Sequence, residues 1–316
     1  MKHTTLFNIV ATALVLVGVS ACSSGDSDDE PTNPTPTQPA ESTRIPLTVE
    51  VEEQPVIDAA AAREGMTRTD ITYLQNLTQF SMDFYKDYDI KGHYAFNKNN
   101  NQWTTGANDQ AWPQDNAGVY PFCFYAYTNT GSSDSPFQGG SDPYISVTVD
   151  ENAFKQKDVL VAKSATFSEP NEGPVRLTFH HICAAVGFTI KKKSSLDNIN
   201  LKVTSIVLHN VYNAGDYYYS KGWDNVQTDN SKHNYYTITH SDNMDITTDR
   251  QDLTDNAGHP FYLFMIPQAQ QANGTEGPYL EVNCIKGENG TAKTVTLPFG
   301  IAWSAGYRYY IDIELQ

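Results

Sequence analysis

The stretch from Val175 to Ile190 reads VRLTFHHICAAVGFTI. Apolar residues alternate with polar ones at its start and run almost without interruption after His181. Clusters of Gly, Pro, Asn and Asp bound the stretch, as is usual for a β-strand. It therefore predicts a strand at the centre of the chain.

Similar segments recur on both sides of this stretch, whereas helical periodicity is almost absent. Thr72–Lys86 fits either a helix or a bent strand. Val119–Tyr127 is aromatic on both faces, which predicts burial on both sides of a sheet. Together the segments predict an all-β fold. The other expected strands are Ile45–Glu53, Tyr144–Val149, Val159–Ala162, Leu201–Leu208, Tyr217–Tyr219, Tyr235–Thr239, Phe261–Ile266, Tyr279–Ile285, Thr294–Phe299 and Tyr307–Leu315.

The length of 316 residues suggests two domains, at roughly 150 residues each. A break in composition at Ser168–Pro174 (SEPNEGP) is the best boundary between them. We therefore expect two tandem antiparallel β-sandwiches, an N-terminal domain over residues 44–170 and a C-terminal domain over residues 171–316.

Composition excludes several classes of function. The net charge is −16, which argues against nucleic-acid binding and against adsorption to anionic lipid. The chain contains 14 Phe, 19 Tyr and 4 Trp, and 39% of its residues are hydrophobic. It can therefore fill real cores, and it is not a disordered protein as a whole.

Residues 1–21 have the features of a lipoprotein signal peptide. Lys2 precedes an apolar run, Leu6–Val19, which is too short to span a bilayer because a spanning helix needs about 20 residues. The run ends in Val19-Ser20-Ala21-Cys22, which resembles a bacterial lipobox, in which the cysteine is acylated after cleavage. Cys22 is therefore the predicted lipidation site; a cleaved signal with a chance cysteine is the alternative.

Residues 22–43 form an acidic, proline-rich segment without large apolar residues, and we expect a disordered tether there. Its run Ser27-Asp28-Asp29-Glu30 looks like the export signal of surface lipoproteins in Bacteroides-type bacteria. A merely solvated linker is the alternative interpretation. The hypothesis is a lipoprotein displayed on the outer membrane.

Five segments after the tether follow one another in a characteristic order: Ala111-Trp112-Pro113 leading into Phe122–Tyr127, Asp158–Ala162, Val175–Ile190, Ile266-Pro267-Gln268 and Trp303–Ile313. In this order they resemble the fimbrillin-like proteins, the type V pilins of Bacteroides-type bacteria. The resemblance implies two transthyretin-like β-sandwich domains and a pilus (fimbrial) subunit, stalk or tip, that supports adhesion. It also implies other pilin subunits as partners, with a host or bacterial receptor as a further candidate.

The resemblance also implies maturation by a trypsin-like protease, which removes an N-terminal strand by cutting after an arginine. The resemblance favours Arg68, with Arg63 as the second site. Both lie in a small, polar stretch after Ile45–Glu53, where an exposed loop would be cut easily. Both could equally be ordinary surface arginines.

In the family, subunits assemble by strand exchange, and the last segment of the chain is the candidate donor strand. It alternates apolar and polar residues, as an inserted strand must. The same pattern fits an ordinary last core strand, and both interpretations stay open. The residues on its apolar face are Tyr307, Tyr309, Ile311, Ile313 and Leu315.

No convergent set of catalytic residues is recognisable, so we expect no enzyme and no cofactor. The sequence has no GxSxG, HExxH or glycine-rich phosphate loop. His180 and His181 are adjacent on a strand and point to opposite faces, so they cannot hold one metal ion together. We predict no metal site.

Cys123, Cys183 and Cys284 lie in apolar, strand-like runs. Their odd number would leave at least one thiol unpaired in an oxidising compartment. Small buried hydrophobic residues are the favoured interpretation, and a disulfide plus a spare thiol is the alternative.

The rival function is a surface glycan-binding lipoprotein. Trp103, Trp112 and Tyr217-Tyr218-Tyr219 could stack on sugar rings, although tyrosines on strands usually pack in cores. A glycan binder should act as a monomer with closed sheet edges, whereas a pilin has a removable strand.

Overall fold

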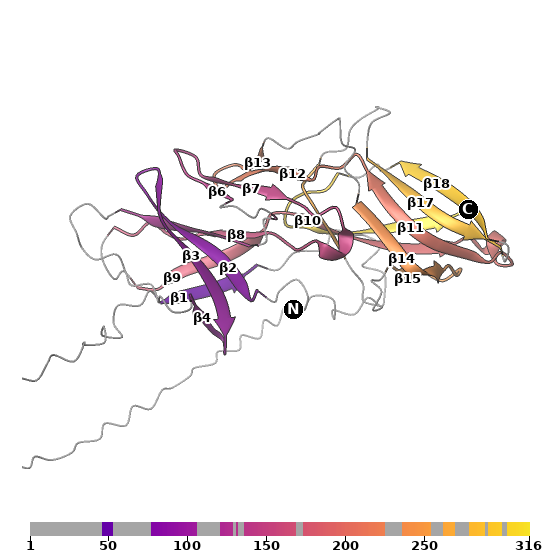
Figure 1. Ribbon diagram of the computed structural model, residues 1–316, viewed down its shortest axis with the longest axis horizontal. Helices are drawn as coiled ribbons and strands as arrows, with labels where there is room; N and C mark the ends of the chain where they lie inside the picture. The colour runs from indigo at the N-terminus through magenta and orange to yellow at the C-terminus, as the bar shows by residue number, and fades with distance from the viewer. Residues whose placement is uncertain are drawn as a thin grey trace, which may run out of the picture. The chain divides into compact units, whose positions relative to one another are not determined.

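The protein is seen in a computed structural model (Figure 1). The structure describes residues 46–52, 77–105, 121–128, 131, 136–168, 173–224, 236–253, 262–268, 278–287, 290–298 and 302–316. The predicted signal peptide, tether and boundary residue 170 lie outside these ranges.

The described chain is built almost wholly of strands, with two short 3₁₀ helices, Ala153–Lys155 and Ser194–Leu196. The all-β prediction is confirmed. The strands are β1 Leu47–Val51, β2 Gln79–Lys86, β3 Asp89–Asn99, β4 Gln102–Thr104, β5 Cys123–Tyr127, β6 Phe137–Gln138, β7 Tyr144–Thr148, β8 Leu160–Lys163, β9 Val175–His181, β10 Ala184–Lys192, β11 Leu201–His209, β12 Ala214–Tyr218, β13 Gly222–Asp224, β14 Tyr236–Asp245, β15 Gln251–Asp252, β16 Leu263–Met265, β17 Tyr279–Lys286, β18 Thr291–Pro298 and β19 Arg308–Leu315.

Seven strands form the first sheet, in the order β1-β9-β8-β5-β2-β3-β4. Two tight hairpins connect the last three strands of this sheet. Asp87-Tyr88 joins β2 to β3, and Asn100-Asn101 joins β3 to β4. The φ angles of these four residues lie between 49° and 64°. Two-residue loops with positive φ at both positions match the natural twist of the strands that they join. The turns therefore hold β2, β3 and β4 in register.

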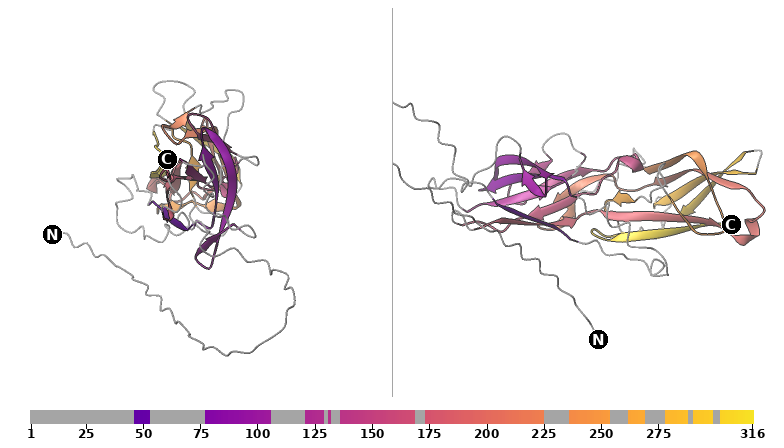
Figure 2. Two further views of the ribbon diagram at one scale, coloured as in Figure 1. Left: turned by 90° about the vertical axis from the view of Figure 1, so that its left-hand side faces the viewer. Right: turned by 90° about the horizontal axis from the view of Figure 1, so that it is seen from below.

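The first sheet curls so that its two ends share one core. Phe80 in β2 and Phe179 in β9 touch, although β5 and β8 lie between their strands. The curvature of the purple strands of this sheet is visible in the left view of Figure 2. The buried residues of this curled core are Phe80, Met82, Phe96, Phe122, Phe124, Ala126, Leu160, Ala162, Phe167, Val175, Leu177 and Phe179.

A smaller sheet, β13-β12-β7-β6, covers the other face of the first sheet. Strand β5 contributes to both cores, because Phe124 belongs to the curled core while Tyr125 and Tyr127 point toward the smaller sheet. All five residues of β5 are buried. The prediction that the aromatic segment Val119–Tyr127 is buried on both faces is confirmed for β5.

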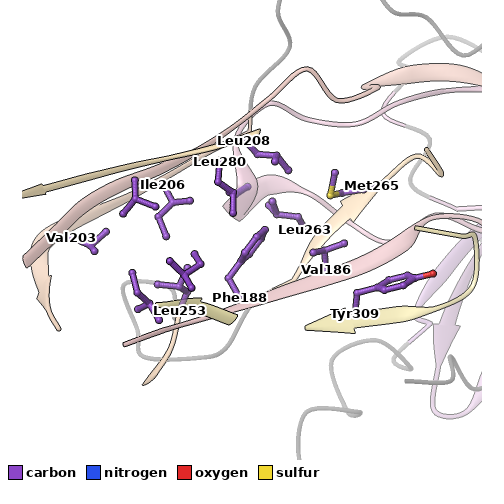
Figure 3. Packing of buried hydrophobic residues seen from close by; sticks show 14 of the residues in the cluster. Val186, Phe188, Val203, Ile206, Leu208, Leu253, Leu263, Met265, Leu280 and Tyr309 are labelled. Atoms are coloured by element: carbon purple, nitrogen blue, oxygen red, sulfur yellow. The ribbon is translucent and has the colours of Figure 1, made fainter. Parts of the chain in front are cut away.

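A second pair of sheets follows. In one, β10 pairs with β15 and β16 on one side and with β19 on the other. The facing sheet has the order β14-β11-β17-β18. Figure 3 shows Phe188 of β10 and Leu263 of β16 in the core between these sheets, on the side that faces Ile206 of β11. Val186 and Tyr309 belong to the same buried cluster.

The chain passes from the first sheet to the second pair between His181 and Ala184. The expected single strand Val175–Ile190 is therefore two strands, β9 and β10, which lie in different sheets. Pairing also crosses the expected boundary, because β12 pairs with β7. The division at residue 170 stays a prediction.

Two further expectations have clear outcomes. The part of Thr72–Lys86 that the structure describes contains a strand, β2. Cys123, Cys183 and Cys284 are all buried, and none forms a disulfide. The preferred interpretation of these cysteines, as small residues within cores, is confirmed.

Candidate assembly site

The first candidate site is β1, the edge strand of the first sheet. It lies parallel to β9, with Leu47 opposite Val175 and Val51 opposite Phe179. Leu47, Val49 and Val51 pack against the curled core, but all three are only half-buried. β1 is thus a five-residue edge strand that packs against the core without full burial.

Backbone hydrogen bonds close both ends of β1. The amide of Val175 donates to the carbonyl of Pro46 at 2.8 Å, and the amide of Glu52 donates to the carbonyl of Phe179 at 2.9 Å. The ladder therefore extends one residue beyond each end of the strand.

Two histidines hold the Glu52 end. His181 is buried, with 6% of its surface exposed, and its Nε2 donates to the Glu52 carbonyl oxygen at 3.0 Å. His180 points to the opposite, exposed face, where its Nδ1 lies 2.7 Å from the Glu52 carboxylate. The prediction that the two imidazoles face opposite ways is confirmed. Both nevertheless contact the same residue of β1.

Asp158 orients the buried imidazole. Its carboxylate is hydrogen-bonded to Nδ1 of His181, and both side chains are almost fully buried. Burial raises the pKa of Asp158, while the hydrogen bond and charge of His181 oppose this rise, as does the charge of Arg308. Both nitrogens of His181 are thus engaged, one by Asp158 and one by the carbonyl that follows β1.

The second candidate site is β19. It runs parallel to β10 from Arg308, opposite Ala185, to Leu315, opposite Lys192. In this chain it is a strand of the second pair of sheets, and donation to another subunit is a prediction that the fold leaves untested.

The five predicted donor residues differ in their burial. Tyr309, Ile313 and Leu315 are buried in the second core, and Ile311 is half-buried against it. Tyr307 precedes the strand and is 37% exposed.

Polar contacts fix the other face of β19. Asp312 accepts a hydrogen bond from Thr189 at 2.5 Å and also pairs with Arg250. Glu314 lies 3.9 Å from the ammonium group of Lys191. These contacts were not foreseen, because their partners lie far away in the sequence.

The remaining predicted site residues are distributed as follows. Cys22, Arg63, Arg68 and Trp112 lie outside the described residues. Of the candidate sugar-stacking rings, Trp103 packs against the curled core.

The tyrosine run separates by strand geometry. Tyr217 and Tyr219 pack inward on the smaller sheet, whereas Tyr218 turns outward beside Tyr144, under the ammonium group of Lys221. The run therefore offers one outward ring rather than three.

Within the described ranges, no group of three or more His, Cys, Asp or Glu side chains is placed to hold a metal ion. Among the same residues, no helix is long and apolar enough to cross a membrane.

The packed sheets, with parallel edge strands beside β9 and β10, define a β-sandwich protein. The chain belongs to the fimbrillin-like family, whose profile matches residues 41–316. No curated protein sequence matches it significantly.

Several solved structures are similar to this chain at low sequence identity. A candidate cell adhesion protein of Bacteroides uniformis is 16% identical, with a TM-score of 0.46, and the alignment covers 77% of this chain and 89% of that chain. One from Bacteroides ovatus is 13% identical, with a TM-score of 0.47 and coverages of 86% and 92%. A fimbrial protein of Bacteroides ovatus is 12% identical, with a TM-score of 0.37 and coverages of 86% and 51%.

Proposed function

We propose that this protein is a pilus subunit, exported as a surface lipoprotein through Cys22 and matured by removal of β1. Membership of the fimbrillin-like family supports the pilus role. The observation that carries the proposal is the state of β1, a half-buried parallel strand at the edge of a curled sheet.

Loss of β1 would create an acceptor groove. It would uncover backbone groups along β9 and the apolar surface now covered by Leu47, Val49 and Val51. Free N–H and C=O groups at a sheet edge are a template for another chain's strand. Three apolar side chains, at about 1.5–3 kcal/mol each when fully buried, would give such a joint several kcal/mol before ordering costs.

We further propose that the subunit occupies a tip or capping position. Donation by β19 would uncover the edge of β10 and the part of the second core that Ile313 and Leu315 fill. The cost of that exposure favours β19 as a core strand. A subunit that accepts a strand and donates none ends a pilus.

The maturation step is tested on the cell surface. Mass spectrometry of the surface form should find an N-terminus at Thr69 or Glu64, after Arg68 or Arg63. An intact, lipidated Cys22 terminus on all surface molecules would refute removal of β1.

The position in the pilus is tested by melting. Ile311→Asp combined with Ile313→Asp should collapse the melting temperature of the monomer, because one of these side chains is buried and the other half-buried. A matched control places the same charges on exposed positions of β18, with Thr291→Asp and Thr296→Asp. An unchanged melting temperature for the β19 variant would refute the core role and favour a donor strand.

A further inference from the structure

We infer that His180 and His181 form a clamp that selects the strand occupying the β1 site. The inference rests on the proposed strand exchange and specifies its partner. The favoured occupant is a strand of another pilin subunit that runs parallel to β9 and carries alternating apolar residues followed directly by an acidic residue.

The buried half of the clamp recognises backbone. The Nε2–H of His181 is donated to the Glu52 carbonyl, and its Nδ1 is held by Asp158. Departure of β1 removes the Glu52 acceptor and opens this N–H to water. An incoming strand that buries the N–H again must present a carbonyl oxygen at the same point, because an unsatisfied buried donor is costly.

The position of that carbonyl sets the register of a strand that runs parallel to β9, as β1 does. Glu52 donates its own amide to Phe179 and offers its carbonyl to His181, so one residue completes the ladder and meets the clamp. A strand shifted by one residue would turn its apolar side chains away from the curled core. Core and clamp therefore require the same register.

The exposed half of the clamp recognises a side chain. His180 lies on the outer face of β9 and pairs with the Glu52 carboxylate at 2.7 Å. Glu50 also points outward on β1, but its partner across the ladder is Thr178, an uncharged residue. An acidic residue is thus favoured after the last apolar residue of the occupant, and not two positions earlier.

The test uses lipid-free full-length protein after limited trypsin cleavage, with a fluorescent synthetic peptide of residues 45–53 as the probe. Anisotropy gives the affinity of the wild-type peptide, of Glu52→Gln and of the matched control Glu50→Gln. We expect Glu52→Gln to weaken binding about two- to fivefold and Glu50→Gln to leave it unchanged. On His180→Ala protein the two altered peptides should bind alike.

The buried half is tested on the protein side. His181→Ala should weaken all three peptides about tenfold, because the lost contact is to backbone, and His181→Gln should regain part of the loss because its amide can donate to the same carbonyl. If His181→Ala does not fold, the comparison of His181→Gln with wild type replaces it. Equal affinities of the Glu52→Gln and Glu50→Gln peptides for wild-type protein would overturn the clamp.

The clamp and the proposed function fail differently. If no peptide binds cleaved wild-type protein, strand exchange at this site is refuted. The clamp is then judged in the uncut chain by hydrogen exchange. Amides of β1 should exchange faster in Glu52→Gln than in Glu50→Gln, and equal rates would overturn the clamp there too.

Discussion

The rings of Phe80 and Phe179 lie edge to face with centroids 5.3 Å apart, although two strands separate β2 from β9 in the sheet. The contact means that the first sheet curls far enough for β2 and β9 to share one core. Strand β1 adds the half-buried side chains of Leu47, Val49 and Val51 at the edge of that core.

Phe179→Ala should destabilise the protein by about 3–5 kcal/mol, because it opens a cavity where the two ends of the sheet meet. Urea denaturation measures the change. Thr178→Ala, at the neighbouring exposed position, is the control and should change stability little. A loss below about 1 kcal/mol for Phe179→Ala would contradict a core shared by β2 and β9.

Asp83→Asn should stabilise the protein at pH 7 and have less effect at pH 4. Burial raises the pKa of Asp83 above its ordinary value of 3.8, although the hydrogen bond and charge of His93 oppose the rise. The folded state therefore binds this proton more tightly than the unfolded state does. The stability that Asp83 contributes is present below pH 3.8 and is lost as the pH rises through the folded pKa.

Thermal melting of both proteins at the two pH values measures this difference. Asp89→Asn is the control of opposite sign, because the hydrogen bond with Lys91 lowers the pKa of Asp89. If the gain in melting temperature of Asp83→Asn over wild type is no larger at pH 7 than at pH 4, the pKa of Asp83 is not raised in the folded state.

Tyr88→Gly should stabilise the hairpin between β2 and β3. Tyr88 is 70% exposed, so burial of its side chain contributes little to stability. Its φ of 64° places the backbone in the left-handed region, which is unfavourable for a residue with a Cβ. Relief of that conformation is worth about 1 kcal/mol. Tyr88→Ala lacks the ring but keeps the strain, and it should show no gain in melting temperature. Equal melting temperatures for the two variants would argue against strain.

Gly187→Ala should cost about 1–3 kcal/mol, because overpacking forces neighbouring rings to move. A Cβ at this position would come within 3.0 Å of the Tyr310 ring and 3.1 Å of the Tyr262 ring. Tyr310→Ala should therefore cost less in the Gly187→Ala background than in wild type. A double-mutant cycle by denaturation measures the coupling, and additive effects would contradict the contact.

Cys22→Ala should abolish lipidation, so that the variant is released from membranes or keeps its signal peptide. Partitioning of the protein into a detergent phase and intact mass spectrometry measure both outcomes. Replacement of Ser23, which follows the lipobox, is the control. If Cys22→Ala still partitions with membranes, the lipobox assignment is wrong.

Most strands could be predicted because each shows an alternation or a short run of apolar residues within its own segment of the sequence. β3 could have been found too: Ile90, Tyr94 and Phe96 alternate with polar residues, but Gly92 and the many polar side chains weaken the pattern. The split between β9 and β10 leaves no such signal. It arises because the chain changes partners at Ile182-Cys183, and the choice of partner is a property of the whole fold.

The candidate site likewise combines features that the sequence predicts with contacts that only the fold creates. The sequence pattern correctly places His180 and His181 on opposite faces. Their shared partner, Glu52, could not be predicted, since its carbonyl meets a histidine 129 positions later in the chain. Such contacts depend on which strand lies at the edge of the sheet, and adjacent residues do not encode that choice.

The parallel pairing of β1 with β9 has a mechanical consequence. Tension that pulls the N-terminal end of β1 against the C-terminal end of β9 acts along both strands, across hydrogen bonds that lie at an angle to it. The load is then shared by the whole ladder at once, in shear, instead of opening one bond after another as in unzipping. A strand seated there in the same direction would resist traction along the chain far better than an antiparallel strand peeled from one end.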